Sequence, residues 1–375
     1  EIGVRLVGSE MCIRDRIYSE NNDMSHFKFE SYNSDIAEID NDGDILGKRE
    51  GTTWVKAIDT NNGNVNIAII RVIDNNQDYE THVAPKVVSG EDFGIGLKED
   101  GTVWIWGYDD SGLAYSNIPA STNILATYKD VDAGANFAVA LRSNGTVWVI
   151  GDNSYGQLGQ GNTVAKPKFI QVEGLEDIVQ VVAGDTHTVA VDSYGIVYGW
   201  GSNAKGELGA ENINQDTTTP TIISIPNEKV MQISAGKNQT AFVTNSGKVY
   251  GMGSFLNGYV KDTNGVIIED AVKVEVGNGY LLILRQDGSI YKYQIGILTR
   301  VSGVQDAIDI SVLNKTNMYQ SLDEKAYTWG VNTYGQCGTN SISSGIALPT
   351  LVAENGENVF RIGSGYNNTF TILNT

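Results

Sequence analysis

The chain has 375 residues, and its 45 acidic against 26 basic side chains give a formal net charge of −19. The length allows two or three domains or one large repeat array, whereas the acidity argues against a nucleic-acid partner and against docking on anionic lipid. Only two cysteines occur, so a disulfide framework is excluded, and no apolar run approaches the roughly 20 residues of a membrane span. The 43 glycines and 6 prolines favour an all-β fold with many tight turns.

The first sixteen residues, EIGVRLVGSEMCIRDR, share no pattern with the rest of the chain. Residues 10–16, EMCIRDR, resemble the translation of a transposon-end adaptor used in preparing sequencing libraries. We therefore interpret residues 1–16, Cys12 included, as foreign to the fold. The same interpretation predicts that the natural N-terminal sequence is missing.

Residues 17–76 predict a small antiparallel β domain. Alternating runs at 36–39, 53–58 and 65–72 are separated by Asp-Gly and Asn-Gly turns. From Ser34 the order S-x-I-A-x-I-D-x-x-G-x-I-x-G-x-x-x-G-T-T-x-V-x-A is similar to bacterial Ig-like domains of the second group. The resemblance implies an Ig-like β-sandwich, and we expect a partial one because such a sandwich has further strands upstream.

Residues 77–375 are repetitive, with a period that suits the blades of a propeller. Copies of one motif, GEDFGIGLKEDGTVWIWG in the first, begin at Gly90, Gly134, Gly184, Gly236 and Gly277. A decayed copy follows from Asn314 and a half-copy from Gly365. Each copy predicts a strand that ends before the first glycine, a second strand, a tight turn and a third strand.

Two further features recur in these copies. The turn positions of the repeat, where glycine tolerates positive φ, are Gly101, Gly145, Gly195, Gly247 and Gly288, with Glu324 in the decayed copy. An aromatic residue in each third strand, interpreted as blade core, is found at Trp104, Trp148, Tyr198, Tyr250, Tyr291 and Tyr327. After the third strand, three copies continue as N-x-x-G-x-L-G, from Asn153, Asn203 and Asn332, with Cys337 in place of leucine in the last.

This order of elements resembles the regulator-of-chromosome-condensation repeat. The resemblance implies a seven-bladed β-propeller with four-stranded blades, of which the chain holds six copies and half of a seventh. We therefore expect an all-β fold, with a seven-bladed-type propeller over residues 77–375 behind the partial Ig-like sandwich, and truncation at both ends. A ring left open would expose an apolar blade face at each break.

The sequence shows no catalytic, metal-binding or cofactor-binding constellation, and we predict that the protein is not an enzyme. His26, His82 and His187 are dispersed, with no metal-ligand spacing. His187 could serve as a base or ligand, but a hydrogen-bonded interior residue is the favoured interpretation. Cys337 is interpreted as a small buried hydrophobe.

Recognition is expected on the loops of one end of the propeller. Candidate contact residues are Tyr108, Asp109, Asp110, Asn153, Tyr155, Asn203, Lys205, Asn332 and Tyr334. The alternative, which we favour for Asn and Gly, is that these residues form the turns.

The first functional hypothesis is a bacterial surface or secreted protein whose propeller binds a protein or a glycan, with the Ig-like domain as a stalk. No nucleic acid, cofactor or membrane insertion is expected for it. The second is a regulator, because relatives in the resembling family include a nuclear guanine-nucleotide exchange factor and a secreted inhibitor of β-lactamases. The third is an enzyme that uses the propeller as a substrate domain beside a separate catalytic module.

Overall fold

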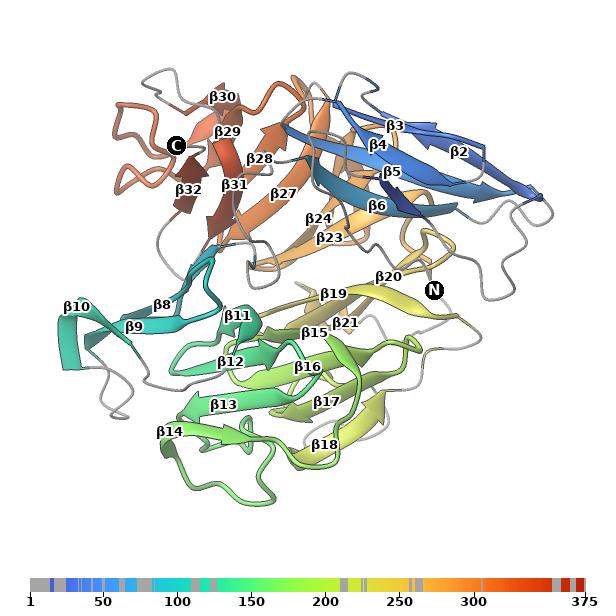
Figure 1. Cartoon of the computed structure of the whole chain (residues 1–375). Coiled ribbons are helices and arrows are strands. Elements are labelled where there is room, and N and C mark those ends of the chain that lie inside the picture. The colour runs from blue at the N-terminus through green and yellow to red at the C-terminus, as the bar shows by residue number, and fades with distance from the viewer. Residues whose placement is uncertain are drawn as a thin grey trace.

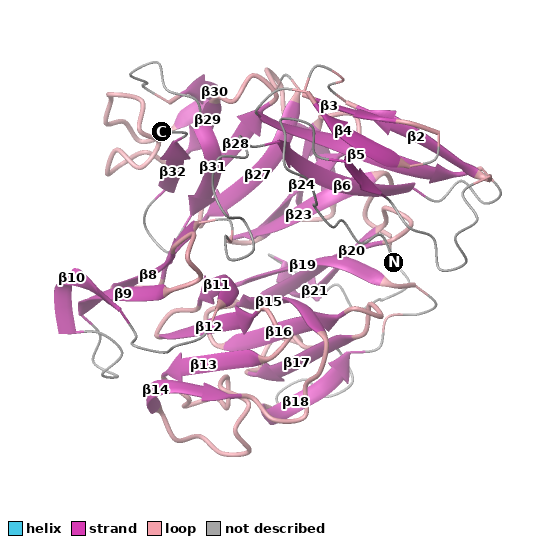
Figure 2. Cartoon of the chain, viewed as in Figure 1, coloured by secondary structure: helices cyan, strands magenta, loops and turns pink. Residues whose placement is uncertain are grey.

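The computed structural model consists of strands and turns, and Figure 2 shows no helix among the residues it describes. Those residues are 14–16, 25–32, 34, 36–41, 43–48, 51–60, 65–72, 83, 85–108, 115–121, 127–209, 215–223, 225, 228–255, 258–259, 266–304, 306–352, 359–364 and 369–373. The strands form an N-terminal pair of sheets and a ring of seven sheets (Figure 1). The all-β prediction is confirmed.

The N-terminal unit has two three-stranded antiparallel sheets, in the orders β1-β4-β3 and β2-β5-β6. Their strands are β1 (Arg14–Arg16), β2 (Phe27–Ser31), β3 (Ala37–Ile39), β4 (Asp44–Gly47), β5 (Gly51–Asp59) and β6 (Val65–Val72). The buried core of this unit consists of Ile36, Ala37, Ile45, Val55 and Ala57. The three strand runs expected here are present, and the Ig-like identity stays a prediction.

Part of the segment that we interpreted as foreign to the fold is paired with this unit. Strand β1 lies antiparallel to β4, with Asp15 opposite Ile45. The N-terminal unit also contacts the ring, where the Tyr32 hydroxyl donates a hydrogen bond to Asp306 Oδ1 at 3.0 Å. Burial, together with Asp306 and Asp287, raises the pKa of Tyr32 to about 12, so the phenol keeps its proton.

Six sheets of the ring have four antiparallel strands, lettered A to D here from the ring axis outward. Blades 1 to 3 are β7 (Lys86–Ser89), β8 (Phe93–Leu97), β9 (Val103–Tyr108), β10 (Tyr115–Ser121); β11 (Tyr128–Ala133), β12 (Phe137–Arg142), β13 (Val147–Gly151), β14 (Lys166–Gln171); and β15 (Ile178–Ala183), β16 (His187–Asp192), β17 (Val197–Gly201), β18 (Thr217–Ile223). Blades 4 to 6 are β19 (Val230–Gly236), β20 (Gln239–Thr244), β21 (Val249–Phe255), β22 (Gly258–Tyr259); β23 (Ala271–Gly277), β24 (Tyr280–Arg285), β25 (Ile290–Gln294), β26 (Ile297–Arg300); and β27 (Ala307–Leu313), β28 (Thr316–Ser321), β29 (Ala326–Gly330), β30 (Ile346–Leu351).

The seventh sheet has two described strands, β31 (Val359–Ser364) and β32 (Thr369–Leu373). Strand β31 lies between the A strand of blade 6, β27, and the A strand of blade 1, β7. Figure 1 shows this junction, where the dark red strands approach the cyan ones. The ring therefore closes at its inner strands, and the predicted count of six blades and a half is confirmed.

Glycine is required at two places in most repeats. A Cβ atom on Gly134 would lie 2.0 Å from the ring of Phe137, and one on Gly184 would lie 2.2 Å from the ring of His187, so these two glycines make room for a ring of the strand that follows. The turn glycines have positive φ, 79° at Gly145 for example. In the decayed copy Glu324 takes the same conformation, with φ of 60°, at a cost in free energy of about 1–2 kcal/mol.

A loop of one blade is bonded to the next blade at three junctions. The C–D loop that follows each third strand offers a backbone carbonyl, and a threonine of the following B strand donates to it. The pairs are Thr188 Oγ1 to Gln157 O at 2.8 Å, Thr240 Oγ1 to Glu207 O at 2.7 Å and Thr369 Oγ1 to Gln336 O at 2.6 Å. These three loops are the ones that carry the N-x-x-G-x-L-G motif.

Replacing Thr240 by valine tests this junction. The variant T240V leaves the Glu207 carbonyl unpaired, and it also leaves unpaired His187 Nε2, which lies 3.0 Å from Thr240 Oγ1. We expect a loss of about 2–3 kcal/mol in the free energy of unfolding, because two buried polar groups lose their partners. Guanidinium unfolding measures it. The same substitution at the exposed Thr221 is the control, and equal losses in both variants would contradict the assignment.

Candidate functional site

The seven inner strands enclose a central channel with a cavity of about 670 Å³. Its wall is formed by the A strands of all seven sheets together with the A–B loops at one end. Because successive strands run antiparallel, the A–B and C–D loops lie at one end of the ring and the B–C and D–A connections at the other. The channel and the C–D end are two places where side chains of several blades converge.

One polar position recurs on the inner strands, four residues before the repeat glycine or, in the decayed copy, before Leu313 in its place. In blades 2 to 6 the residue at this position directly follows a shift in the register between strands A and B. In blade 1 it pairs with Leu97, which corresponds to the B-strand partner in the other blades. We call these residues the polar belt: Lys86, Asp130, Gln180, Gln232, Lys273 and Asp309. Arg361 holds the same register in β31.

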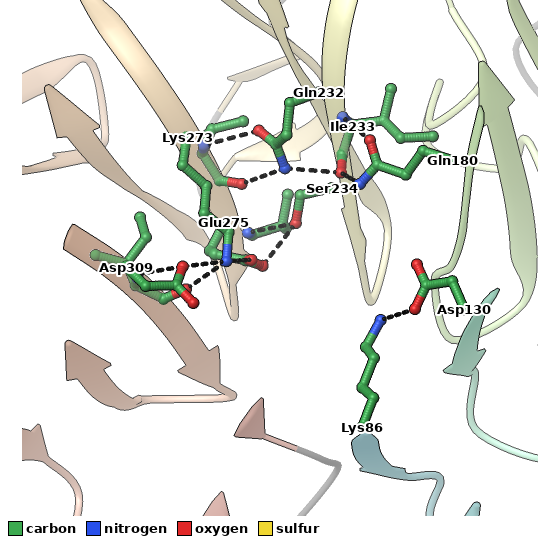
Figure 3. A network of polar contacts seen from close by, with 12 residues as sticks. Lys86, Asp130, Gln180, Gln232, Ile233, Ser234, Lys273, Glu275 and Asp309 are labelled. Carbon is green, nitrogen blue, oxygen red and sulfur yellow. Dashed lines mark hydrogen bonds and ion pairs between the residues drawn. The ribbon is translucent and has the colours of Figure 1, made fainter. Parts of the chain in front are cut away.

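The belt residues reach from one blade to the next (Figure 3). Lys86 Nζ lies 2.8 Å from Asp130 Oδ1, which joins blades 1 and 2. Gln180 bonds both backbone groups of Ile233, its Oε1 accepting from the nitrogen and its Nε2 donating to the carbonyl, each at 3.0 Å. Gln232 bonds Val274 in the same way, at 2.9 and 3.0 Å. These two side-chain amides thus link the A strands of neighbouring blades by hydrogen bonds, as backbone groups link the strands within one sheet.

Lys273 is the centre of the most highly charged part of the belt. Its Nζ lies 2.7 Å from Asp309 Oδ1 and 3.0 Å from Glu275 Oε1, and it donates to the Ile310 carbonyl at 2.8 Å. Burial lowers the pKa of Lys273, but the two carboxylates more than offset this, so the pKa lies above its ordinary value and the ammonium stays charged. Here one ammonium is shared by two carboxylates.

Asp132 differs from Asp130, Glu275 and Asp309, the channel carboxylates that form ion pairs. Its Oδ2 accepts a hydrogen bond from the Ala183 nitrogen at 2.9 Å, and among the described residues no Lys or Arg forms an ion pair with it. Burial raises the pKa of Asp132 to about 6, with Asp130 contributing and Lys86 opposing. The carboxylate is therefore ionised at neutral pH, and the charge of Lys86 compensates it only in part.

The three motif asparagines, which we proposed as contact residues, are buried inside their loops. Asn153 Oδ1 accepts from the Leu158 nitrogen at 2.9 Å, and its Nδ2 donates to the carbonyls of Asn162 and Val164. Asn203 and Asn332 bond their own loops through the same two atoms. These side chains stabilise the turns, which is the alternative favoured above. The residues that follow them in the loops are the ones exposed at the surface.

The other proposed contact residues lie at the surface or outside the described residues. Tyr155 is 43% exposed, Tyr334 is 90% exposed, and Lys205 is exposed. Tyr108 ends strand β9, and its side chain lies outside the described residues, as do Asp109 and Asp110. Tyr155, Lys205 and Tyr334 belong to C–D loops, so all three lie at the same end of the ring.

His187 is an interior residue, as its interpretation from the sequence favoured. It is fully buried between blades 3 and 4, with Nε2 3.0 Å from Thr240 Oγ1. Because that hydroxyl donates to the Glu207 carbonyl, the imidazole must be the donor, which fixes the Nε2–H tautomer. Burial lowers the pKa of His187 to about 4, so the ring is neutral at pH 7.

No metal site is found in the part of the chain that the structure describes, where no three His, Cys, Asp or Glu side chains are placed to share an ion. Cys337 is buried, and burial raises the pKa of its thiol, which suits a packing residue. The polar belt was not predicted from the sequence. The available signal was a polar residue four positions before the glycine of each of the five full copies.

The loop asparagines yield a stability prediction. In the variant N153D, a carboxylate would face the Asn162 and Val164 carbonyls in place of the donating amide. We expect the free energy of unfolding to fall by about 3 kcal/mol, and the loop to become sensitive to proteases. N162D, at an exposed position of the same loop, is the matched control. A variant N153D as stable as N162D would show that the hydrogen bonds of Asn153 do not stabilise the loop.

The raised pKa of Asp132 yields a pH prediction. The folded state holds this proton more tightly than the unfolded chain, so the contribution to stability is full below pH 4 and is lost as pH rises through 6. The variant D132N should therefore be more stable than the parent by about 1 kcal/mol at pH 8 and equal to it at pH 4. Thermal unfolding at both pH values measures the difference. A variant that is less stable at pH 8 would show that the charge is compensated.

Comparison with known proteins agrees with this architecture. Two models of the "Regulator of chromosome condensation (RCC1) repeat" match, one at residues 144–191, 194–243 and 323–372, the other at 86–113, 128–157 and 178–207. "Regulator of chromosome condensation" from Homo sapiens is 35% identical over 171 residues, covering 39% of this chain and 38% of that protein. The Mus musculus protein is 36% identical over the same length. The chain thus spans about two fifths of these curated relatives.

A solved structure supports the fold at lower sequence similarity. Human WBSCR16 superposes with a TM-score of 0.69 at 16% identity, covering 82% of this chain and 89% of that one. At this identity the likeness concerns the fold alone. The repeat matches, which together span about half of the chain, carry the assignment. The chain belongs to the family of regulator of chromosome condensation (RCC1) repeat proteins.

Proposed function

We propose that this protein is a non-catalytic β-propeller that binds another protein through its C–D loop end. The observation that carries the proposal is the exposure of large apolar side chains on two rigid loops of that end. In blade 6 Tyr334 is 90% and Ile342 77% exposed, and in blade 2 Tyr155 is 43% and Val164 61% exposed. Aromatic side chains dominate the energetics of protein interfaces.

The rigidity of the loops supports this role. Asn153 and Asn332 are buried, and each spans its loop with hydrogen bonds to the backbone on both sides. A loop held in one conformation loses little entropy when a partner binds. The exposed tyrosines are two residues beyond these asparagines, so their positions are set before any encounter.

The chemistry of the loops points to a partner that is recognised by shape. Residues 331–345, VNTYGQCGTNSISSG, contain no charged side chain, although the whole chain has a net charge of −19. Tyrosine among serine, glycine and asparagine is also the composition of antibody binding loops. The exposed aliphatic groups favour a protein over a glycan, and a glycan remains the second possible outcome of the test.

We further propose that the protein acts outside the cell, secreted or on a bacterial surface. The support is the similarity of the sequence from Ser34 onward to bacterial Ig-like domains, and the presence of that unit on the same chain as the propeller. Fractionation of the source cells tests this location. Recovery of the protein only in the cytoplasm would refute it.

A regulatory role is the second candidate, and one observation favours it. The match to proteins named regulator of chromosome condensation extends over 171 residues at 35% identity. Binding assays with purified small GTPases, and nitrocefin hydrolysis by β-lactamases in the presence of the protein, test its two forms. Saturable binding of a GTPase, or inhibition of a β-lactamase, would favour the regulatory role over the first proposal.

Site-specific photo-crosslinking tests the loop end directly. A benzophenone amino acid at position 334 or 155 should give discrete protein adducts in a cell-envelope extract, because these side chains are exposed and held in place. The control position is Tyr194, which is 65% exposed in a B–C turn at the opposite end of the ring. Adducts from position 194 alone would move the binding surface to that end, and adducts with glycan alone would refute a protein partner.

A further inference from the structure

A second ring of side chains lines the channel two residues beyond the polar belt. In chain order around the ring it consists of Val88, Asp132, Val182, Ser234, Glu275, Ser311 and Gly363, all of which line the cavity. Asp132 therefore has a valine on each side of it at the same height of the channel. Both neighbours of Asp132 in this ring are therefore apolar.

The two acidic residues of this second ring have different surroundings. Glu275 pairs with Lys273 and accepts a hydrogen bond from Ser234 Oγ at 3.1 Å. Asp132 accepts hydrogen bonds from the backbone nitrogens of Ala183 and Ala133, and the ammonium of Lys86, whose charge acts on Asp132, is bonded to Asp130. Asp132 is thus left without an ion pair of its own among the described residues, although a buried anion is costly when unpaired.

We propose that the central channel binds an alkylammonium group, whose charge is received by Asp132 and whose alkyl part lies against Val88 and Val182. The cavity of about 670 Å³ is within the range of small-molecule sites and is open to a chain of several methylene groups. A compact, strongly hydrated divalent cation would need several oxygen ligands, which a single carboxylate between two valines does not supply. The proposal stands independently of the loop end.

The same group could come from a free amine or from a lysine side chain of a partner, and two probes distinguish these sources. Isothermal titration with pentylamine tests the free amine, and titration with acetyl-Gly-Lys-Gly-amide tests the lysine. The neutral probes are 1-pentanol and the Nε-acetylated peptide. We expect saturable one-to-one binding of at least one cationic probe, and binding of its neutral counterpart at least tenfold weaker.

The variant D132N tests the contribution of the Asp132 charge to binding. Its amide keeps the oxygen that accepts from Ala183 and loses the charge, so we expect at least a tenfold loss of affinity in a folded protein. E173Q removes one charge at an exposed site outside the cavity and should bind like the parent. The affinity of the parent should also fall about tenfold from pH 7.5 to pH 5, as the carboxylate gains its proton.

Three outcomes would overturn the proposal: no saturable binding of either cationic probe, binding of the cationic probe to D132N as tight as to E173Q, or binding of the neutral probe as tight as that of the charged one. The last result would mean an apolar channel without charge recognition. None of these results bears on the crosslinks expected from the loop end, so the two proposals fail separately.

Discussion

The packing of each sheet against the next is the constraint on which the rest of the molecule depends. The buried clusters of the ring each join two adjacent blades: one unites Val139 and Leu141 of blade 2 with Val181 and Trp200 of blade 3, and others join the remaining pairs as far as blade 7. A blade alone would leave two apolar faces in water, so it gains its stability only from its neighbours. Closure of the inner circle by β31 matters because it gives blade 1 its second neighbour.

Polar contacts determine which blades fit together. Each N-x-x-G-x-L-G loop presents a carbonyl to the following blade, and that blade carries a threonine at the matching place: Thr188, Thr240 and Thr369. After the blades without this motif, the same place is occupied by Ala138, Leu281 or Asn317. Loop and threonine therefore occur together, although they lie in different repeats. The repeats have diverged in pairs, and this favours one order of blades.

The sequence analysis predicted what is encoded within a single repeat: the strands, the turns, the number of blades and the interior position of His187. It missed the polar belt, because the belt position holds Lys, Asp or Gln and so shows no repeated residue. Its bonds also join residues about one repeat apart, such as Gln180 and Ile233, which become neighbours only when the ring is assembled. For the loops, the motif indicated the right segment, but Asn332 points inward and Tyr334 outward, a difference that depends on the loop backbone.

The two rings of the channel follow different physical requirements. At the belt, Lys, Asp and Gln side chains pair across the blade junctions, so polarity there is explained by stability. In the second ring, two residues beyond the belt, valine, serine and glycine occupy most positions. The acidic side chain of Glu275 in this ring forms an ion pair with Lys273. Asp132 bonds across a junction too, since its Oδ2 accepts from the Ala183 nitrogen of the next blade as Ser234 Oγ accepts from the Val276 nitrogen. The serine makes that contact without the desolvation cost of a charge, so the junction does not require a carboxylate. A charge that the junction does not require, on a wall facing the cavity, supports the proposal that the cavity receives a cation.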